Sequence, residues 1–119
     1  MVDRETMRRT LNKMMKSWNW NNTWGWDFPM MAMSAARMGE GETAINALLM
    51  DKPKNAYLPN GHNSQMGAFL PLYLPGNGGL LYATAMMAAG WDGVNKSNAP
   101  GFPANGKWVV RFEGLHPAP

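Results

Sequence analysis

The chain has 119 residues, enough for one domain at most, and 45% of them are hydrophobic, which favours a folded core over disorder. The formal net charge of +3 excludes a strongly basic or acidic protein, and the lack of cysteine excludes disulfides and thiolate metal sites. No apolar run approaches the roughly 18 residues that a membrane span needs, so we expect a soluble chain with no membrane partner.

Four of the eleven basic residues lie close together near the start of the chain: Arg4, Arg8, Arg9 and Lys13. Modules that bind single-stranded nucleic acid combine basic residues with aromatic side chains on which bases stack, and this stretch has no such aromatics. We therefore interpret the cluster as the solvated face of a helix and expect no nucleic-acid partner.

The first predicted helix is capped by Asp3, which is a favourable residue at a helix N-terminus. Its apolar positions follow the helical period and form one buried stripe: Met7, Leu11, Met14, Met15 and Trp18. The helix is followed by a loop at residues 19–28, which contains three further tryptophans.

A pair of helices is predicted next, over residues 30–38 and 42–50. Pro29 suits the first turn of the first helix, and Gly39 suits its C-cap. Because the connection is short, we expect an antiparallel hairpin. The first of the two helices has almost no polar face and should be enclosed on most sides.

Residues 51–79 carry four prolines and five glycines, which exclude a long helix or a central strand. A loop of this length is typically functional. A further enclosed helix is predicted over residues 80–89, closed by Gly90. Residues 107–112 alternate apolar and polar side chains as in a short, half-buried strand.

Flat aromatic rings and a carboxylate come together in Trp24-Gly25-Trp26-Asp27. Sugars present apolar C–H faces and a rim of hydroxyls, so this combination suits a carbohydrate site. The same residues would equally suit a buried core with Asp27 at the positive end of the following helix. The motif alone leaves both interpretations open.

A second polar cluster, Asn60-Gly61-His62-Asn63, lies in the turn-rich segment. Zinc needs three or four ligands and the chain has only two histidines, so we expect no metal. His62 is a structural loop residue, a polar ligand contact or an acid–base group. The glycine-rich run at 75–79 lacks the pattern of a phosphate loop and is better suited to a helix N-terminus near a polar ligand.

These motifs together resemble the C-terminal part of six-hairpin (α/α)6-toroid glycoside hydrolases, in particular the α-L-fucosidase family 95 and the related family 65. The resemblance covers residues 3–93 approximately and lies in the order of four short motifs: Gly25-Trp26, Ala36-Arg37-Met38-Gly39, Asn60-Gly61-His62-Asn63 and Gly76-Asn77-Gly78-Gly79. It implies an active site at one end of a helical toroid, with Trp26, Asp27, His62 and Asn77 on loops facing it.

One departure from the family pattern concerns the catalytic base. In the fucosidase pattern an aspartate that activates water precedes the Gly-Asn pair, and here Pro75 takes that place. Hydrolysis uses two carboxyl groups, about 5 Å apart for retention and about 6.5–9.5 Å apart for inversion. Asp27 alone has a sugar-like aromatic setting, so a second carboxylate would have to come from another chain segment.

We therefore expect a mainly α chain: a single segment, 1–119, from the C-terminal portion of a larger toroid, with a helical part at about 3–93 and a tail at 94–119 that ends in a short β strand. The expected function is part of a glycoside hydrolase, inactive alone, with no cofactor. Asp27 is the candidate catalytic residue, and the candidate substrate-binding residues are Trp24, Trp26, Asn60, His62, Asn63 and Asn77.

Two alternatives remain, a non-catalytic carbohydrate-binding module and a structural docking fragment. The expected partners are a carbohydrate and either the remaining helices of the enzyme or a second copy of the chain. The two nearly all-apolar helices should leave surface for such a partner. The compartment is not predicted, and export of a longer protein stays open.

Overall fold

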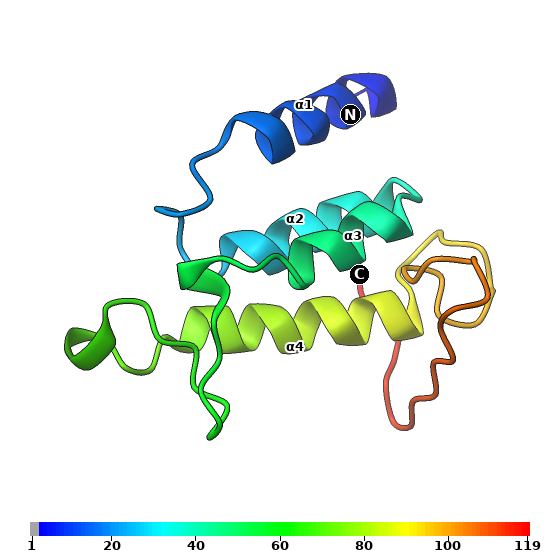
Figure 1. The fold of residues 1–119 in the computed structure, drawn as a ribbon. Coiled ribbons are helices and arrows are strands. Elements are labelled where there is room, and N and C mark those ends of the chain that lie inside the picture. The colour runs from blue at the N-terminus through cyan, green and yellow to red at the C-terminus, as the bar shows by residue number, and fades with distance from the viewer. Residues whose placement is uncertain (1–2) are drawn as a thin grey trace.

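The computed structural model describes residues 3–119, and these residues form a mainly helical chain, as predicted (Figure 1). The helices are α1 (Arg4–Ser17), α2 (Asp27–Arg37), α3 (Gly41–Leu48) and α4 (Leu74–Ala89), with short 3₁₀ helices at Pro53–Asn55 and Gly67–Phe69. In Figure 1, α2 and α4 run in the same direction, whereas α3, which lies between them in the chain, runs antiparallel to both.

Helix α1 begins as predicted. The Thr6 amide donates to the Asp3 carboxylate at 2.8 Å, so the side chain of Asp3 satisfies one of the free N–H groups of the first turn. Of the predicted buried stripe, Leu11 is buried and Met14 and Met15 are half-buried against the core, whereas Met7 and Trp18 are exposed.

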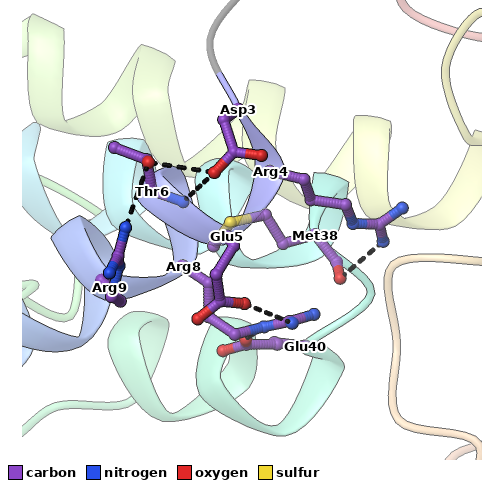
Figure 2. A network of polar contacts seen from close by, with 8 residues as sticks. All are labelled: Asp3, Arg4, Glu5, Thr6, Arg8, Arg9, Met38 and Glu40. Atoms are coloured by element: carbon purple, nitrogen blue, oxygen red, sulfur yellow. Dashed lines mark hydrogen bonds and ion pairs between the residues drawn. The ribbon is translucent and has the colours of Figure 1, made fainter.

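Basic side chains of α1 connect this helix to the α2–α3 hairpin (Figure 2). Arg4 Nη2 donates to the Met38 carbonyl at 2.9 Å, and Arg8 Nε donates to Glu40 Oε1 at 2.8 Å. Arg8 also lies 3.4 Å from Glu5. Part of the basic cluster at the start of the chain thus forms tertiary contacts.

Helices α2 and α3 form the predicted antiparallel hairpin. Gly39 follows the end of α2 with a φ of 79°, the left-handed conformation expected of a residue that terminates a helix. The predicted start of α2, after Pro29, was wrong by a few residues. The helix begins at Asp27, whose carboxylate accepts the Trp24 amide at 2.8 Å, and Pro29 fits inside the first turn, where its missing N–H costs no bond.

The predicted start of α4 at residue 80 was also wrong, because α4 begins at Leu74. The glycine-rich run is therefore the first part of the helix and not a loop. Glycine is needed there for close approach: a Cβ on Gly79 would lie 2.7 Å from Pro29 Cγ of α2. Proline is tolerated in a first helical turn, so Pro75 does not prevent this earlier start.

The core is built from alanine and methionine more than from large branched residues. Small side chains let α2 approach α3 and α4 closely, and flexible methionines fill the remaining space. The buried cluster includes Phe28, Met31, Ala32, Ala35, Ala36, Ala44, Ile45, Ala47, Met86 and Met87.

The strand predicted at residues 107–112 is not formed. In the described part of the chain, β pairing is limited to isolated bridges, Tyr57 with Asn63 and Trp91 with Ala118. The second bridge anchors the C-terminal tail beside the end of α4, since the Asp92 amide donates to the Ala118 carbonyl at 2.8 Å. Residues 107–112 have no neighbouring strand within residues 3–119, so their alternation produces no sheet.

One face of α4 is apolar and uncovered. Leu74, Leu81 and Tyr82 have helical spacing that places them on one face, and Leu81 is 73% exposed. The expectation that α4 would be enclosed therefore holds for only part of its circumference. Within residues 3–119, no helix combines the length and the apolarity that crossing a bilayer requires.

Candidate functional site

The predicted site residues lie at one end of the helical layer, where α2 and α4 begin. The loop before α2 and the long loop before α4 meet at this end (Figure 1). Trp24 and Trp26 belong to the first loop, Asn60, His62 and Asn63 to the second, and Asp27 and Asn77 to the first turns of the helices.

Asn63 is the centre of this end of the molecule. Its side chain is fully buried and donates through Nδ2 to the carbonyls of Lys54, at 3.2 Å, and Ala56, at 2.9 Å. Its backbone carbonyl accepts the Tyr73 amide at 2.8 Å. Since these groups are already paired inside the chain, the structure does not offer the Asn63 side chain to a substrate.

Gln65 extends the network from Asn63 to the tryptophan loop. Gln65 Nε2 donates to Asn63 Oδ1 at 2.9 Å, and Gln65 Oε1 accepts the Gly25 amide at 2.8 Å. Gln65 is buried, like Asn63. The two loops are therefore joined by buried side-chain amides, with Gly25 directly against them.

Asn77 connects the same network to α4. Its Oδ1 accepts the Asn63 amide at 3.1 Å, and its Nδ2 donates to the Gly61 carbonyl at 2.7 Å. Asn60 is exposed and His62 half-buried, and Asn60 Nδ2 lies 3.4 Å from His62 Nδ1. Asn60 and His62 thus lie at the surface of a loop that Asn77 holds in place.

The two tryptophans of the candidate site are 44% and 47% exposed, for Trp24 and Trp26 respectively. The Trp24 ring lies 5.4 Å from the Tyr73 ring, and Lys54 Nζ lies 5.4 Å from the Trp24 ring centroid. Lys54 Nζ also donates to the Gln65 carbonyl at 2.5 Å, so the cation–π contact is tied to the amide network. These contacts fix the orientation of the Trp24 ring.

Asp27 is nearly buried at the start of α2, where its carboxylate faces the N-terminal turn. It also influences its neighbours: burial, and after it the negative charge of Asp27, raises the pKa of the Tyr73 phenol above its ordinary 10.0. Trp24, Asp27 and Tyr73 therefore form one connected group.

The raised pKa of Tyr73 predicts how stability changes in alkali. Because folding favours the neutral phenol, the stabilisation is complete below pH 10 and is lost as the pH rises through the raised pKa of the folded state. We expect Tyr73→Phe to leave stability at pH 7 nearly unchanged and to make the alkaline decline shallower, as measured by urea unfolding across this range. If the stability of both proteins declined equally steeply in alkali, the raised pKa of Tyr73 would be contradicted.

The cavities around Trp91 and Trp108 lie at the other end of α4. One, of about 330 Å³, is lined by Arg4, Arg37 and Trp91 among others, and another, of about 360 Å³, by Phe102 and Trp108 among others. Neither is lined by a predicted site residue. Within residues 3–119 there is also no group of three acidic or histidine side chains that could hold a metal ion.

Lys54, Gln65 and Tyr73 were not singled out from the sequence, although they hold the predicted residues together. Gln65 gave the clearest missed signal, because it is a second side-chain amide only two residues after Asn63. Lys54 and Tyr73 carry no comparable pattern, since their contacts join segments distant in the chain.

Comparisons of the chain with protein-family models, curated proteins and solved structures gave no match.

Proposed function

We propose that this chain forms sugar-contacting loops of a six-hairpin (α/α)6-toroid glycoside hydrolase and is inactive by itself. The observation that carries the proposal is the pair of exposed tryptophans, Trp24 and Trp26, at the end where two parallel helices begin. Indole rings offer the flat apolar surface on which the C–H face of a sugar stacks.

In this proposal Trp26 is the stacking platform, because Trp24 is already in contact with Tyr73 and Lys54. The exposed Asn60 and the half-buried His62 supply groups that hydrogen-bond sugar hydroxyls. The side-chain oxygen and nitrogen of Asn77 both hydrogen-bond the loop, so Asn77 positions Asn60 and His62 and does not contact the sugar itself. The buried network fixes the platform before the sugar arrives, which lowers the entropic cost of binding.

The proposed inactivity of the isolated chain follows from the need for two carboxyl groups. Asp27 supports the N-terminal turn of α2, and the other acidic residues belong to different parts of the chain: Asp3, Glu5, Glu40, Glu42, Asp51, Asp92 and Glu113. The second carboxylate would come from further helical hairpins, and the uncovered face of α4 with Leu74, Leu81 and Tyr82 is where these hairpins would pack.

A non-catalytic carbohydrate-binding module is the second candidate, favoured by the same exposed tryptophans. The two functions require different groups from the chain. A binding module needs only the loops of this chain, whereas a hydrolase needs a second carboxylate besides Asp27.

The stacking role is tested by Trp26→Ala. We expect the affinity for a bound sugar to fall by about tenfold, because an aromatic contact contributes up to ~1.5 kcal/mol beyond its buried area. The measurement is an NMR titration that follows the indole N–H signals. The matched control is Trp18→Ala, which removes an exposed tryptophan at the end of α1. Equal losses in both variants would reject Trp26 as the platform.

A further inference from the structure

Residues 108–112, which lie between bends at Lys107 and Glu113, form a segment whose backbone amides are unused in the described part of the chain. Residues 108–112 contain no turn or bend, and within residues 3–119 none of their amides has a partner. The Val110 carbonyl accepts Asn98 Nδ2 at 3.1 Å, and the Trp108 ring lies 5.4 Å from the Phe102 ring. The segment is thus anchored to the chain along one side only.

The contact with Asn98 indicates which edge is open. In an extended chain the N–H and C=O of one residue point toward the same edge, and those of the next residue point toward the other. Because the Val110 carbonyl faces Asn98, the groups of Val109 and Arg111 face outward. Val109 is apolar, β-branched and 85% exposed, which is unusual for a segment with no partner.

We propose that a second copy of this chain covers the open edge, pairing antiparallel through residues 108–112 with Val110 on the two-fold axis. Val109 of each copy then lies opposite Arg111 of the other, and each such pair exchanges two backbone hydrogen bonds. Val110 forms the close pair without hydrogen bonds, which agrees with the use of its carbonyl by Asn98. The inference is independent of the proposed sugar site at the other end of α4.

Charge complementarity selects this register. Centring the pair on Val110 places Trp108 opposite Phe112, a favourable cross-strand pair, and brings Lys107 and Glu113, at the bends that flank the segment, to the same end of the pair, each twice by symmetry. Centring it on Val109 would place Lys107 opposite Arg111, and centring it on Arg111 would place two arginines opposite each other. Both alternatives bring like charges together.

The symmetry also limits assembly to two copies. Only one edge of the segment is open, since the other faces Asn98, so pairing about a two-fold axis leaves no edge for a third copy. Arg111 weakens the pairing slightly, because it lies diagonally across from Arg111 of the other copy and the two positive charges repel. It is exposed, so water and salt screen that repulsion.

Single-cysteine variants test the register without ambiguity, because the chain has no cysteine of its own. Val110→Cys places two thiols directly opposite each other, within reach of a disulfide, whereas in Val109→Cys the thiols are diagonal. We expect the first variant to oxidise to a covalent dimer about ten times faster than the second. Equal rates, or faster linking at position 109, would overturn the register.

Charge exchange tests the same interface without a covalent bond. Lys107→Glu and Glu113→Lys should each raise the dimer dissociation constant about tenfold, since like charges then lie at the same end of the pair, and the double exchange should restore it. Val109→Pro removes an outward N–H and should give a monomer, whereas Val109→Thr should not. Molar mass from light scattering is the readout. A monomeric native chain at every concentration, or no rescue by the double exchange, would refute the proposal.

Discussion

Asn63→Asp is expected to lower the free energy of unfolding by about 3–5 kcal/mol at neutral pH. The substitution keeps the shape of the side chain but replaces the amide donor with a carboxylate oxygen. That oxygen would face the carbonyls of Lys54 and Ala56, to which Asn63 donates at 3.2 and 2.9 Å. Only the Gln65 amide, which donates to the other oxygen, would compensate this buried charge directed at two acceptors.

The matched control is Asn60→Asp, the same chemical change on the exposed part of the same loop. It keeps the oxygen that accepts the His62 amide and should change stability by less than about 0.5 kcal/mol. Urea unfolding measures both variants. A loss at position 63 as small as that at position 60 would show that Asn63 is not the centre of the network.

Gly76→Ala and Gly78→Ala are expected to change stability in opposite directions, although both lie in the first half of α4. A Cβ on Gly76 would lie 2.8 Å from Asn63 Cγ and 3.3 Å from Tyr73 Cδ1, so the loop must move away from the helix. We expect a loss of about 2–3 kcal/mol, because a close contact with a rigid neighbour is not relieved by small shifts.

Gly78 has no neighbour within 4 Å of an added Cβ. Alanine there should stabilise α4 by about 0.5–1 kcal/mol, because it restricts the unfolded chain and favours the helix. Thermal or urea unfolding of both variants checks the signs. If Gly78→Ala also destabilised the protein, residues 74–79 would not be helical, and the earlier start of α4 would be contradicted.

The helices could be predicted where their signals are local. Asp3 and the apolar stripe of α1, and the short connection of the α2–α3 hairpin, depend on residues a few positions apart. The start of α4 was missed because glycines in a helix look like a loop when their packing partners are unknown. Gly76 and Gly79 are explained only by Asn63 and Pro29, which are distant in sequence.

The residues of the candidate site could be predicted in part, but not their roles. Composition and motif order drew attention to Asn63 and Asn77, and the structure places both in a buried or half-buried network that supports the loops. Exposure separates Trp24, Trp26 and Asn60 from these supporting residues, and exposure depends on tertiary packing. The strand at 107–112 was predicted from alternation alone, which cannot indicate whether a second strand is present.

The most direct test of the sugar-site proposal is one NMR titration of the isotopically labelled chain with fucose, glucose and galactose and with their nitrophenyl glycosides. The indole signals of Trp24 and Trp26 and the release of nitrophenol are followed in the same sample. The proposal predicts saturable shifts of these two signals without any release. Absence of shifts at saturating sugar would contradict the sugar site, and release that Asp27→Asn abolishes would contradict the inactivity of the isolated chain.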